Sequence, residues 1–254
     1  MTHSQKKVRI DKLLHDAGFA ESRTRAQALV MAGVVLVDEK RVDKPSELHS
    51  PAAAIRIKGD VPENKYVSRA GLKLEEALRA FEIDPTAMTC IDIGASTGGF
   101  TDCLLKHGAK KVTAIDVGTN QIVWSLRQDP RVDVRENTNA RSLKPADFET
   151  KFDLAVMDVS FISVTRILPA LYSILKKTGH AIILIKPQFE VGKGEVGKGG
   201  IVRDPKKHER VIAEVNEFAE RLGFRLNGLI DSPIRGAEGN KEFLAMYDIQ
   251  PPAA

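Results

Sequence analysis

The stretch Ile91-Asp92-Ile93-Gly94-Ala95-Ser96-Thr97-Gly98-Gly99-Phe100 decides the fold of most of this 254-residue chain. An apolar strand leads into glycines, and a helical pattern follows. This order is typical of the first unit of a parallel α/β sheet, and its glycines let a ligand approach the free N–H groups at the helix N-terminus. The glycine spacing is not that of the dinucleotide-binding motif. Asp92 would repel a pyrophosphate but attract an ammonium group, which favours a zwitterionic cofactor such as S-adenosylmethionine.

Strand and helix patterns alternate beyond this turn, which predicts βαβ units. Helices are expected over residues 99–107, 119–127 and 164–177, with a further helix bearing Val211, Val215, Phe218 and Leu222. The last two strands are expected to be antiparallel. The prediction for residues 70–254 is a Rossmann-like, mostly parallel α/β sheet, with a glycine-rich loop beside the site over 188–205. Its strands are expected near residues 88–93, 111–116, 131–135, 153–158, 181–186, 225–231 and 243–248.

Residues 1–59 have a separate pattern that predicts a small α+β domain. Ile10, Leu13, Leu14 and Ala17 share one face of a helix that Gly18 can close. Ser22 can cap a second helix, which carries Ala26, Leu29 and Val30. A strand over 34–37, a turn over 38–40 and a strand with Ile55 and Ile57 follow. Residues 60–69, DVPENKYVSR, are predicted to be a linker.

Composition and charge limit the class of protein. Residues 1–60 contain 11 Lys and Arg against 8 Asp and Glu, so they hold +3 of the chain's net charge of +4. Positive charge at one end favours an anionic partner such as nucleic acid. No apolar run is long enough for a transmembrane helix, and the N-terminus lacks a secretory signal, which predicts a cytoplasmic protein without a membrane partner. Cys90 and Cys103 are expected to be reduced core thiols. The six histidines have no ligand spacing, so no metal site is predicted.

Polar residues at the ends of the next strands extend the cofactor site. Asp116 ends the second strand, where a carboxylate can bind the two hydroxyls of a ribose, and Asn139 follows the third, where it could contact adenine. The alternatives are a helix-capping Asp116 and a tight turn at 94–99 that holds no ligand. The candidate cofactor ligands are Asp92, Gly94, Ala95, Ser96, Thr97, Gly98, Gly99, Phe100, Asp116 and Asn139.

Charged residues end two other apolar strands. Asp158 follows residues 153–157, and Lys186 follows Ile182–Ile185. A lysine that ends a buried strand is costly unless it has a partner or a task, and in such a site it can act as a base. The alternative is a lysine that reaches water. Lys73 lies on a predicted helix, where a lysine is usually solvated. Glu242 precedes the last strand and alone gives no indication of a function.

The ordered set Lys73, Asp158, Lys186 and Glu242 resembles the Lys-Asp-Lys-Glu tetrad of the FtsJ-like ribose 2′-O-methyltransferases. The surrounding strings resemble the TlyA branch of that family, whose members are often labelled hemolysins: YVSRAGLKL, DIGASTGGFTDCLL, MDVSFIS, LIKPQFE and EGNKEFL. Residues 9–47 resemble the S4-like alpha-L RNA-binding module, although Asp38-Glu39-Lys40 stands where that module more often has Asn-Gly.

The resemblance implies a two-domain enzyme that transfers methyl from S-adenosylmethionine to a ribose 2′-oxygen of ribosomal RNA, with cytidine as the target. Ribosomal RNA or a ribosomal subunit would be its partner. It implies that the tetrad is catalytic, with Lys186 as the candidate base and Lys73 or water as alternatives. The candidate phosphate contacts in the N-terminal module are Arg9, Lys12, Arg23, Arg25 and Arg41.

Three other functions are weighed. A cysteine-dependent base methyltransferase needs a cysteine at a strand end, and Cys90 and Cys103 are not placed so. An exocyclic-amine methyltransferase favours Asn/Asp-Pro-Pro-aromatic, which residues 158–161 do not match. A membrane-lysing hemolysin lacks support from any amphipathic membrane helix. A non-catalytic RNA-binding protein is disfavoured by the intact tetrad.

Overall fold

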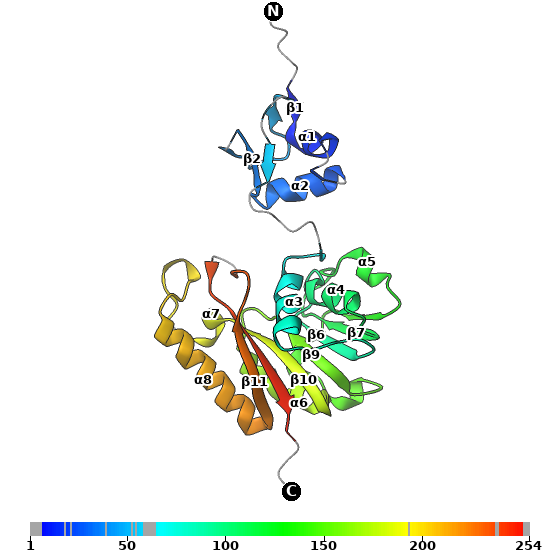
Figure 1. Ribbon diagram of the computed structural model, residues 1–254, viewed down its shortest axis with the longest axis vertical. Helices are drawn as coiled ribbons and strands as arrows, with labels where there is room; N and C mark the ends of the chain where they lie inside the picture. Colours follow the sequence, from blue (N-terminus) through cyan, green and yellow to red (C-terminus); the bar gives the residue numbers. More distant parts are fainter. Residues whose placement is uncertain are drawn as a thin grey trace, which may run out of the picture. The chain divides into compact units, whose positions relative to one another are not determined.

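The computed structural model describes residues 7–250, except 18, 21, 39, 52, 54, 58–64, 193, 237 and 238. The chain divides into two compact units, Met1–Lys65 and Tyr66–Ala254. Each is considered separately, and Figure 1 shows the elements of both. Gly18 and Glu39, as well as residues 60–64 of the predicted linker, lie outside the described residues.

The first unit packs two helices against short strands. Ser22 caps α2, as predicted, because its hydroxyl accepts a hydrogen bond from the Arg25 N–H at 3.2 Å. Ile10 and Leu14 of α1 and Val30 of α2 are buried with Val35 of β2. Strands β3, β2 and β5 pair in that order, and β1 pairs with β4. The bounds are β1 Val8–Arg9, α1 Ile10–Asp16, α2 Arg23–Met31, β2 Val35–Val37, β3 Lys40–Arg41, β4 Leu48–His49 and β5 Ile55–Ile57.

The described part of the second unit contains one sheet with the strand order β11-β12-β10-β9-β6-β7-β8. The strands from β10 to β8 are parallel, whereas β12 is antiparallel to both β10 and β11. The prediction of a mostly parallel sheet with an antiparallel last strand is confirmed. The bounds are β6 Thr89–Ile93, β7 Lys111–Ile115, β8 Val132–Arg135, β9 Phe152–Met157, β10 Leu175–Ile185, β11 Phe224–Asp231 and β12 Phe243–Ile249.

Two predicted helices are shorter than expected. The segment 119–127 is helical only in α5, Trp124–Arg127, because N–H groups of the preceding loop bind the Glu136 carboxylate. The segment 164–177 breaks into a 3₁₀ turn, Val164–Arg166, and α6, Leu168–Ile174; β10 then begins at Leu175. The other helices are α3 Ala70–Ala80, α4 Gly99–Lys106, α7 Pro187–Glu190 and α8 Pro205–Leu222.

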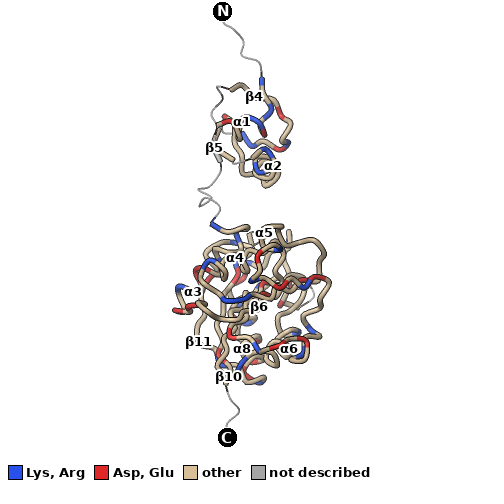
Figure 2. The backbone as a smooth tube through the Cα atoms, turned by 90° about the vertical axis from the view of Figure 1, so that its right-hand side faces the viewer, with Lys and Arg blue, Asp and Glu red and all other residues tan. Residues whose placement is uncertain are grey.

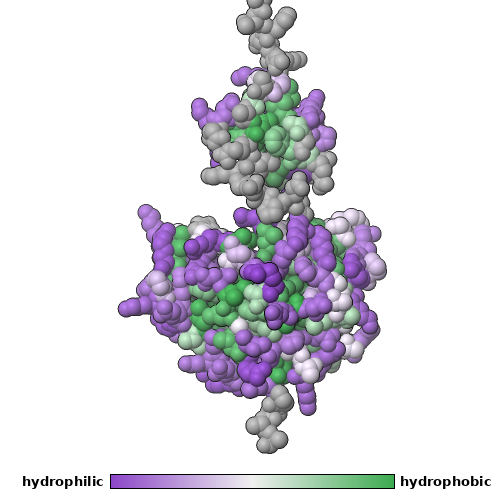
Figure 3. All heavy atoms as spheres, viewed as in Figure 1, coloured by the Kyte–Doolittle hydropathy of each residue, from purple (hydrophilic) through white to green (hydrophobic). Residues whose placement is uncertain are grey.

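Alternating residues of β10 divide the core between the two faces of the sheet. Ile183 and Ile185 pack in the cluster that contains residues of α6 and α8, whereas Ile182 and Leu184 pack with residues of α3 and α4. On the face of the second unit seen in Figure 3, hydrophilic residues surround an apolar area near its middle. Lys and Arg residues are interspersed with Asp and Glu residues along the backbone (Figure 2).

The register brings several strand ends to one edge. Met157 pairs with both Ile93 and Ile183, and Ile185 pairs with Phe243. The residues that follow β6, β9 and β10 therefore lie beside the residues that precede β12. Ligand sites of open α/β sheets form at this carboxyl edge.

Candidate active site

Four charged side chains meet at the carboxyl edge of the sheet. Lys73 Nζ lies 2.6 Å from Glu242 Oε2 and 4.0 Å from Asp158 Oδ2, and Lys186 Nζ lies 2.5 Å from Asp158 Oδ1. The charges alternate in the order Glu242, Lys73, Asp158, Lys186. The structure therefore brings together the four residues that the resemblance singled out, although Lys73 and Glu242 are 169 positions apart.

Three of the four tetrad residues are buried, and Asp158 is partly buried. Lys73, Lys186 and Glu242 are 7%, 8% and 2% exposed. Lys73 lies on the inward face of α3 beside Leu74 and Ala77, so it is not the solvated helix lysine of the alternative reading. Buried ion pairs add little net stability, because the loss of hydration offsets the attraction between the charges. Their presence at a ligand-binding edge points to a chemical task.

Local backbone geometry holds the tetrad in place. Lys186 follows the fully buried end of β10, and its ammonium also donates a hydrogen bond to Ser160 Oγ at 2.9 Å. Gly236 packs directly on Glu242, since a Cβ there would lie 1.9 Å from Glu242 Oε1. Only glycine lets the connection between β11 and β12 pass over that carboxylate.

A cavity of about 280 Å³ adjoins the tetrad. It lies at the ends of β6, β7, β8 and β9, and the predicted residues Gly94, Ser96, Asp116 and Asn139 line it. Asp158 also lines it, so one carboxylate belongs to both the cavity and the tetrad. This shared residue connects a place for a ligand with a place for proton transfer.

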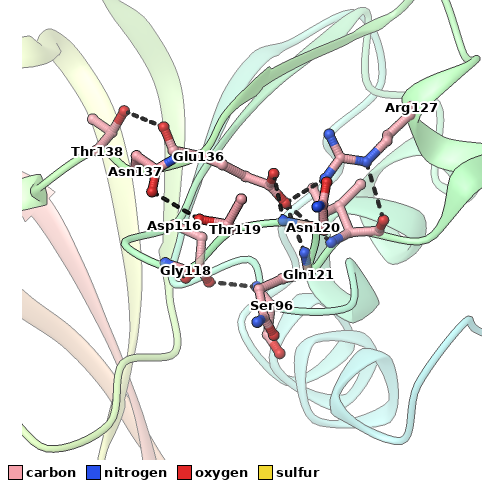
Figure 4. Close-up of polar contacts among 11 residues, drawn as sticks. Ser96, Asp116, Gly118, Thr119, Asn120, Gln121, Arg127, Glu136, Asn137 and Thr138 are labelled. Carbon is pink, nitrogen blue, oxygen red and sulfur yellow. Dashed lines mark hydrogen bonds and ion pairs between the residues drawn. The ribbon is translucent and has the colours of Figure 1, made fainter.

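The Asp116 carboxylate binds the backbone of the glycine turn and of the loop after β7. Its Oδ2 accepts a hydrogen bond from the Ser96 N–H and its Oδ1 from the Gly118 N–H, each at 2.7 Å (Figure 4). Gly94 has φ +83°, and a Cβ there would lie 2.4 Å from the Asp158 carbonyl oxygen. The turn can therefore approach β9 only with glycine at this position.

Glu136 organises the loop that follows β7, and sequence reasoning missed it. Its carboxylate accepts N–H hydrogen bonds from Asn120 and Gln121, each at 2.8 Å, and pairs with Arg127 (Figure 4). The hydrogen bond from Arg127 is the main cause that lowers the pKa of Glu136 to about 2. Its only sequence signal is an acidic residue directly after β8.

Asp92 lies in β6, where it was predicted, but it is covered by protein atoms. It is fully buried, accepts a hydrogen bond from Thr101 Oγ1 at 2.7 Å and does not line the cavity. Its Oδ1 has no hydrogen-bond partner among the described residues. Burial raises its pKa to about 7. The predicted direct contact with an ammonium group therefore does not fit, because protein atoms cover this carboxylate.

Other residues of the glycine stretch pack the fold instead of lining the cavity. Gly98 has φ +99° and a Cβ there would meet Leu126, while a Cβ on Gly99 would lie 2.2 Å from Ser68 Oγ. These two glycines let α4 begin close to its neighbours. The predicted residues of this stretch that do not line the cavity are Asp92, Ala95, Thr97, Gly98, Gly99 and Phe100.

The cavity also has lining residues that are not among the predicted cofactor ligands. Gln121 and Thr138 face it from the loops after β7 and β8, and Ser160 and Phe161 follow Asp158. Phe161 is 90% exposed with φ +65°, and its ring centroid lies 5.1 Å from that of Phe189. A positive φ is costly for a bulky residue and persists where a site requires it.

In the first unit, one buried carboxylate accepts hydrogen bonds from two of the arginines that are predicted to contact RNA. Asp11 is fully buried and accepts hydrogen bonds from Arg9 Nη2 at 2.9 Å, Arg23 Nη2 at 3.1 Å and Gln27 Nε2 at 2.9 Å. The Arg9 hydrogen bond is the main cause that holds the pKa of Asp11 well below its usual range. Asp11 thus fixes two guanidinium groups side by side.

The remaining predicted RNA contacts are spread over the unit. Lys12 is exposed on α1, Arg25 is half-buried on α2, and Arg41 pairs with Asp43 at 2.8 Å. In the described part of the chain, no cluster of three metal-ligating side chains occurs. No described helix is both long and apolar enough to span a bilayer.

Comparisons with known proteins agree with this geometry. The model of the FtsJ-like methyltransferases matches residues 66–248, and that of the S4 domain matches residues 8–51. YqxC of Bacillus subtilis (strain 168), which is named as an rRNA methyltransferase, is 48% identical over 95% of this chain and 85% of its own. The 16S/23S rRNA (cytidine-2′-O)-methyltransferase TlyA of Mycobacterium tuberculosis is 44% identical over 94% of this chain and 88% of its own.

A solved structure shows the same likeness. The hemolysin-named protein of Streptococcus thermophilus aligns with a TM-score of 0.76 at 48% identity, over 97% of this chain and 90% of its own.

Proposed function

The chain belongs to the family of FtsJ-like methyltransferases and carries an S4 domain, and from that premise we propose that it methylates the ribose 2′-oxygen of cytidine in ribosomal RNA. The methyl donor is S-adenosylmethionine. The observation that carries the proposal is the buried tetrad that shares Asp158 with the cavity. Because the substrate is ribosomal RNA, we place the protein in the cytoplasm.

The donor set of the cavity fits a nucleoside cofactor. Asp116 lies at the end of β7, where a carboxylate can accept hydrogen bonds from ribose hydroxyls, and Asn139 and Gln121 offer amides for a base. Asp158 is the member of the tetrad that lines the cavity, and its carboxylate can attract an ammonium or sulfonium charge. S-adenosylmethionine supplies an electrophilic methyl group when it is bound.

The chain's own residues then have to handle one proton. A ribose hydroxyl is a weak nucleophile until its proton leaves, and a positioned base typically contributes about 10²–10⁴-fold. Lys186 is the proposed base. It follows a buried strand, and Asp158 and Ser160 orient its Nζ. Lys73, held by Glu242, lies on the other side of Asp158 and offsets negative charge that develops on the oxygen.

The S4 domain supplies RNA binding. Arg9 and Arg23, oriented by Asp11, can each contact a phosphate, and such contacts give affinity without sequence preference. Specificity for one nucleotide then comes from the second unit, the catalytic unit, which contains the tetrad. The exposed ring of Phe161 at the cavity can stack on a base that has left its helix.

Incubation of the protein with tritiated S-adenosylmethionine and ribosomal particles from an unmodified strain tests the proposal. The methyl group should appear as 2′-O-methylcytidine, which mass spectrometry identifies after digestion and which protects the adjacent phosphodiester from nuclease. A methyl group on a base, or no transfer to ribosomal RNA, would refute the proposal.

A further inference from the structure

A second cavity, of about 480 Å³, lies outside the cofactor site. We call it the arginine cavity because Arg203 and Arg235 line it, together with Lys241 and His208. Its volume is in the range of small-ligand pockets. Neither the cofactor cavity nor the tetrad includes any of these residues.

The walls of the arginine cavity are fixed to one another. Asn240, 2% exposed, accepts a hydrogen bond from the Val202 N–H at 3.0 Å and donates one to the Gly200 carbonyl at 2.9 Å. His208 Nε2 lies 2.8 Å from the Val202 carbonyl and donates to it. The end of the glycine-rich loop, the start of α8 and the β11–β12 connection therefore form one unit, and Figure 1 shows the loop beside that connection.

The charge of this cavity is strongly positive. No hydrogen bond or ion pair within the described part of the chain engages Arg203 or Arg235, and both are exposed. Lys241 pairs with Asp231 at 2.8 Å. No described carboxylate lines the cavity. Two guanidinium groups without carboxylate partners fit the oxygens of a phosphate, which they bind in a bidentate manner.

The cavity is joined to the tetrad through the β11–β12 connection. Lys241 directly precedes Glu242, and Gly236, next to Arg235, packs on the Glu242 carboxylate. A phosphate at Arg203 and Arg235 would therefore be held by the same connection that places Glu242 against Lys73. An RNA backbone anchored at this connection would be bound by the same segment that carries Glu242 of the tetrad.

We propose that the arginine cavity binds a phosphodiester group of the RNA strand that carries the target ribose, with Arg203 and Arg235 as its ligands. The inference rests on the proposed function. It assigns the catalytic unit its own phosphate contact, in addition to those of the S4 domain.

The test uses the full-length protein with Arg203→Gln, Arg235→Gln and the double variant. Arg221→Gln is the matched control, because Arg221 lies in the last turn of the same helix α8, far along the chain from the cavity, and pairs with Glu217 at 3.8 Å. The dissociation constant for ribosomal RNA from an unmodified strain is measured at several salt concentrations. Calorimetry gives the affinity for S-adenosylmethionine and for inorganic phosphate.

We expect each single substitution to raise the RNA dissociation constant about tenfold, the effect of one hydrogen bond to a charged group. The double variant should reduce the magnitude of the slope of log affinity against log salt by about 1, because one phosphate contact is lost. The control and the cofactor affinity should be unchanged. Equal RNA affinity and salt slope in the double variant and the control would overturn the inference.

A double variant that loses inorganic phosphate binding but keeps its RNA affinity would also overturn it, since the cavity would then take a free anion. Wild-type protein that transfers no methyl group to ribose refutes the proposed function instead. The RNA affinities need no methyl transfer, so the two failures are distinguishable.

Discussion

Lys186 Nζ lies 2.5 Å from Asp158 Oδ1, at the point where a buried strand ends beside the cofactor cavity. The pairing explains how a lysine that is 8% exposed is tolerated there. It also places a nitrogen that can exchange a proton next to a carboxylate that faces the ligand.

Asp116→Ala should weaken the binding of S-adenosylmethionine. The substitution removes the carboxylate at the ribose position and leaves the Ser96 and Gly118 N–H groups without their acceptor. The expected loss is about 1–3 kcal/mol of binding free energy. Calorimetry measures it, with Asp133→Ala as control, because Asp133 lies on β8 and does not line the cavity. Equal cofactor affinity in the two variants would remove Asp116 from the site.

Glu136→Ala should loosen the loop after β7. Without the carboxylate, the N–H groups of Asn120 and Gln121 and the Arg127 guanidinium lose their acceptor. We expect a lower cofactor affinity and a lower free energy of unfolding, because these groups lose a charged hydrogen-bond acceptor. Urea unfolding and calorimetry on the same samples check both effects. A variant with unchanged values in both would show that the loop is held by other contacts.

Asp92 should make stability depend on pH. Burial raises its pKa in the folded protein to about 7, above the ordinary value of 3.8. The folded state therefore binds this proton more tightly than the unfolded state. The stabilisation that Asp92 adds to the free energy of unfolding is full below about pH 4 and is lost as the pH rises to about 7. The loss is at most about 4 kcal/mol, from about 1.4 kcal/mol per pH unit.

Urea unfolding of wild type and Asp92→Asn between pH 4 and 8 measures this contribution. The difference in unfolding free energy between the two proteins cancels the other titrating groups, such as Asp11. We expect the wild type to lose stability relative to Asp92→Asn as the pH rises. A difference that stays constant over this range would show that Asp92 is ionised in the folded protein throughout.

Arg9→Gln combined with Arg23→Gln should weaken RNA binding without affecting the cofactor. Both guanidinium groups are about half exposed and are oriented by Asp11. We expect the magnitude of the slope of log RNA affinity against log salt to decrease by about 2, since two phosphate contacts are lost. Arg79→Gln, an exposed arginine on α3 paired with Glu76, is the control. An unchanged salt slope would show that RNA binds elsewhere.

The sequence predicts most of the sheet because its signals are local. Four apolar residues before Lys186, and the glycines after Ile93, each indicate a strand and its end without knowledge of the partner. Parallel strands present these ends at one edge, so Asp158 and Lys186 could be expected to lie close together. Lys73 and Glu242 had no such signal, and only their resemblance to a family tetrad connected them.

The remaining differences come from tertiary contacts. A carboxylate such as Asp92 looks the same in sequence whether it faces a ligand or is covered by Thr101. The loop at 119–122 has helical periodicity, but its N–H groups bind Glu136 from the next strand. Leu175 belongs to β10, not to the preceding helix, because it pairs with Phe152.

Single-turnover methyl transfer by Lys186→Arg tests whether Lys186 accepts the proton of the ribose hydroxyl. Arginine keeps the positive charge beside Asp158, but a guanidinium does not release its proton near neutral pH. With S-adenosylmethionine and ribosomal particles bound at wild-type affinity, the account predicts that the folded variant transfers no methyl group. Near-normal transfer by this variant would contradict it and assign the proton to Lys73 or to water.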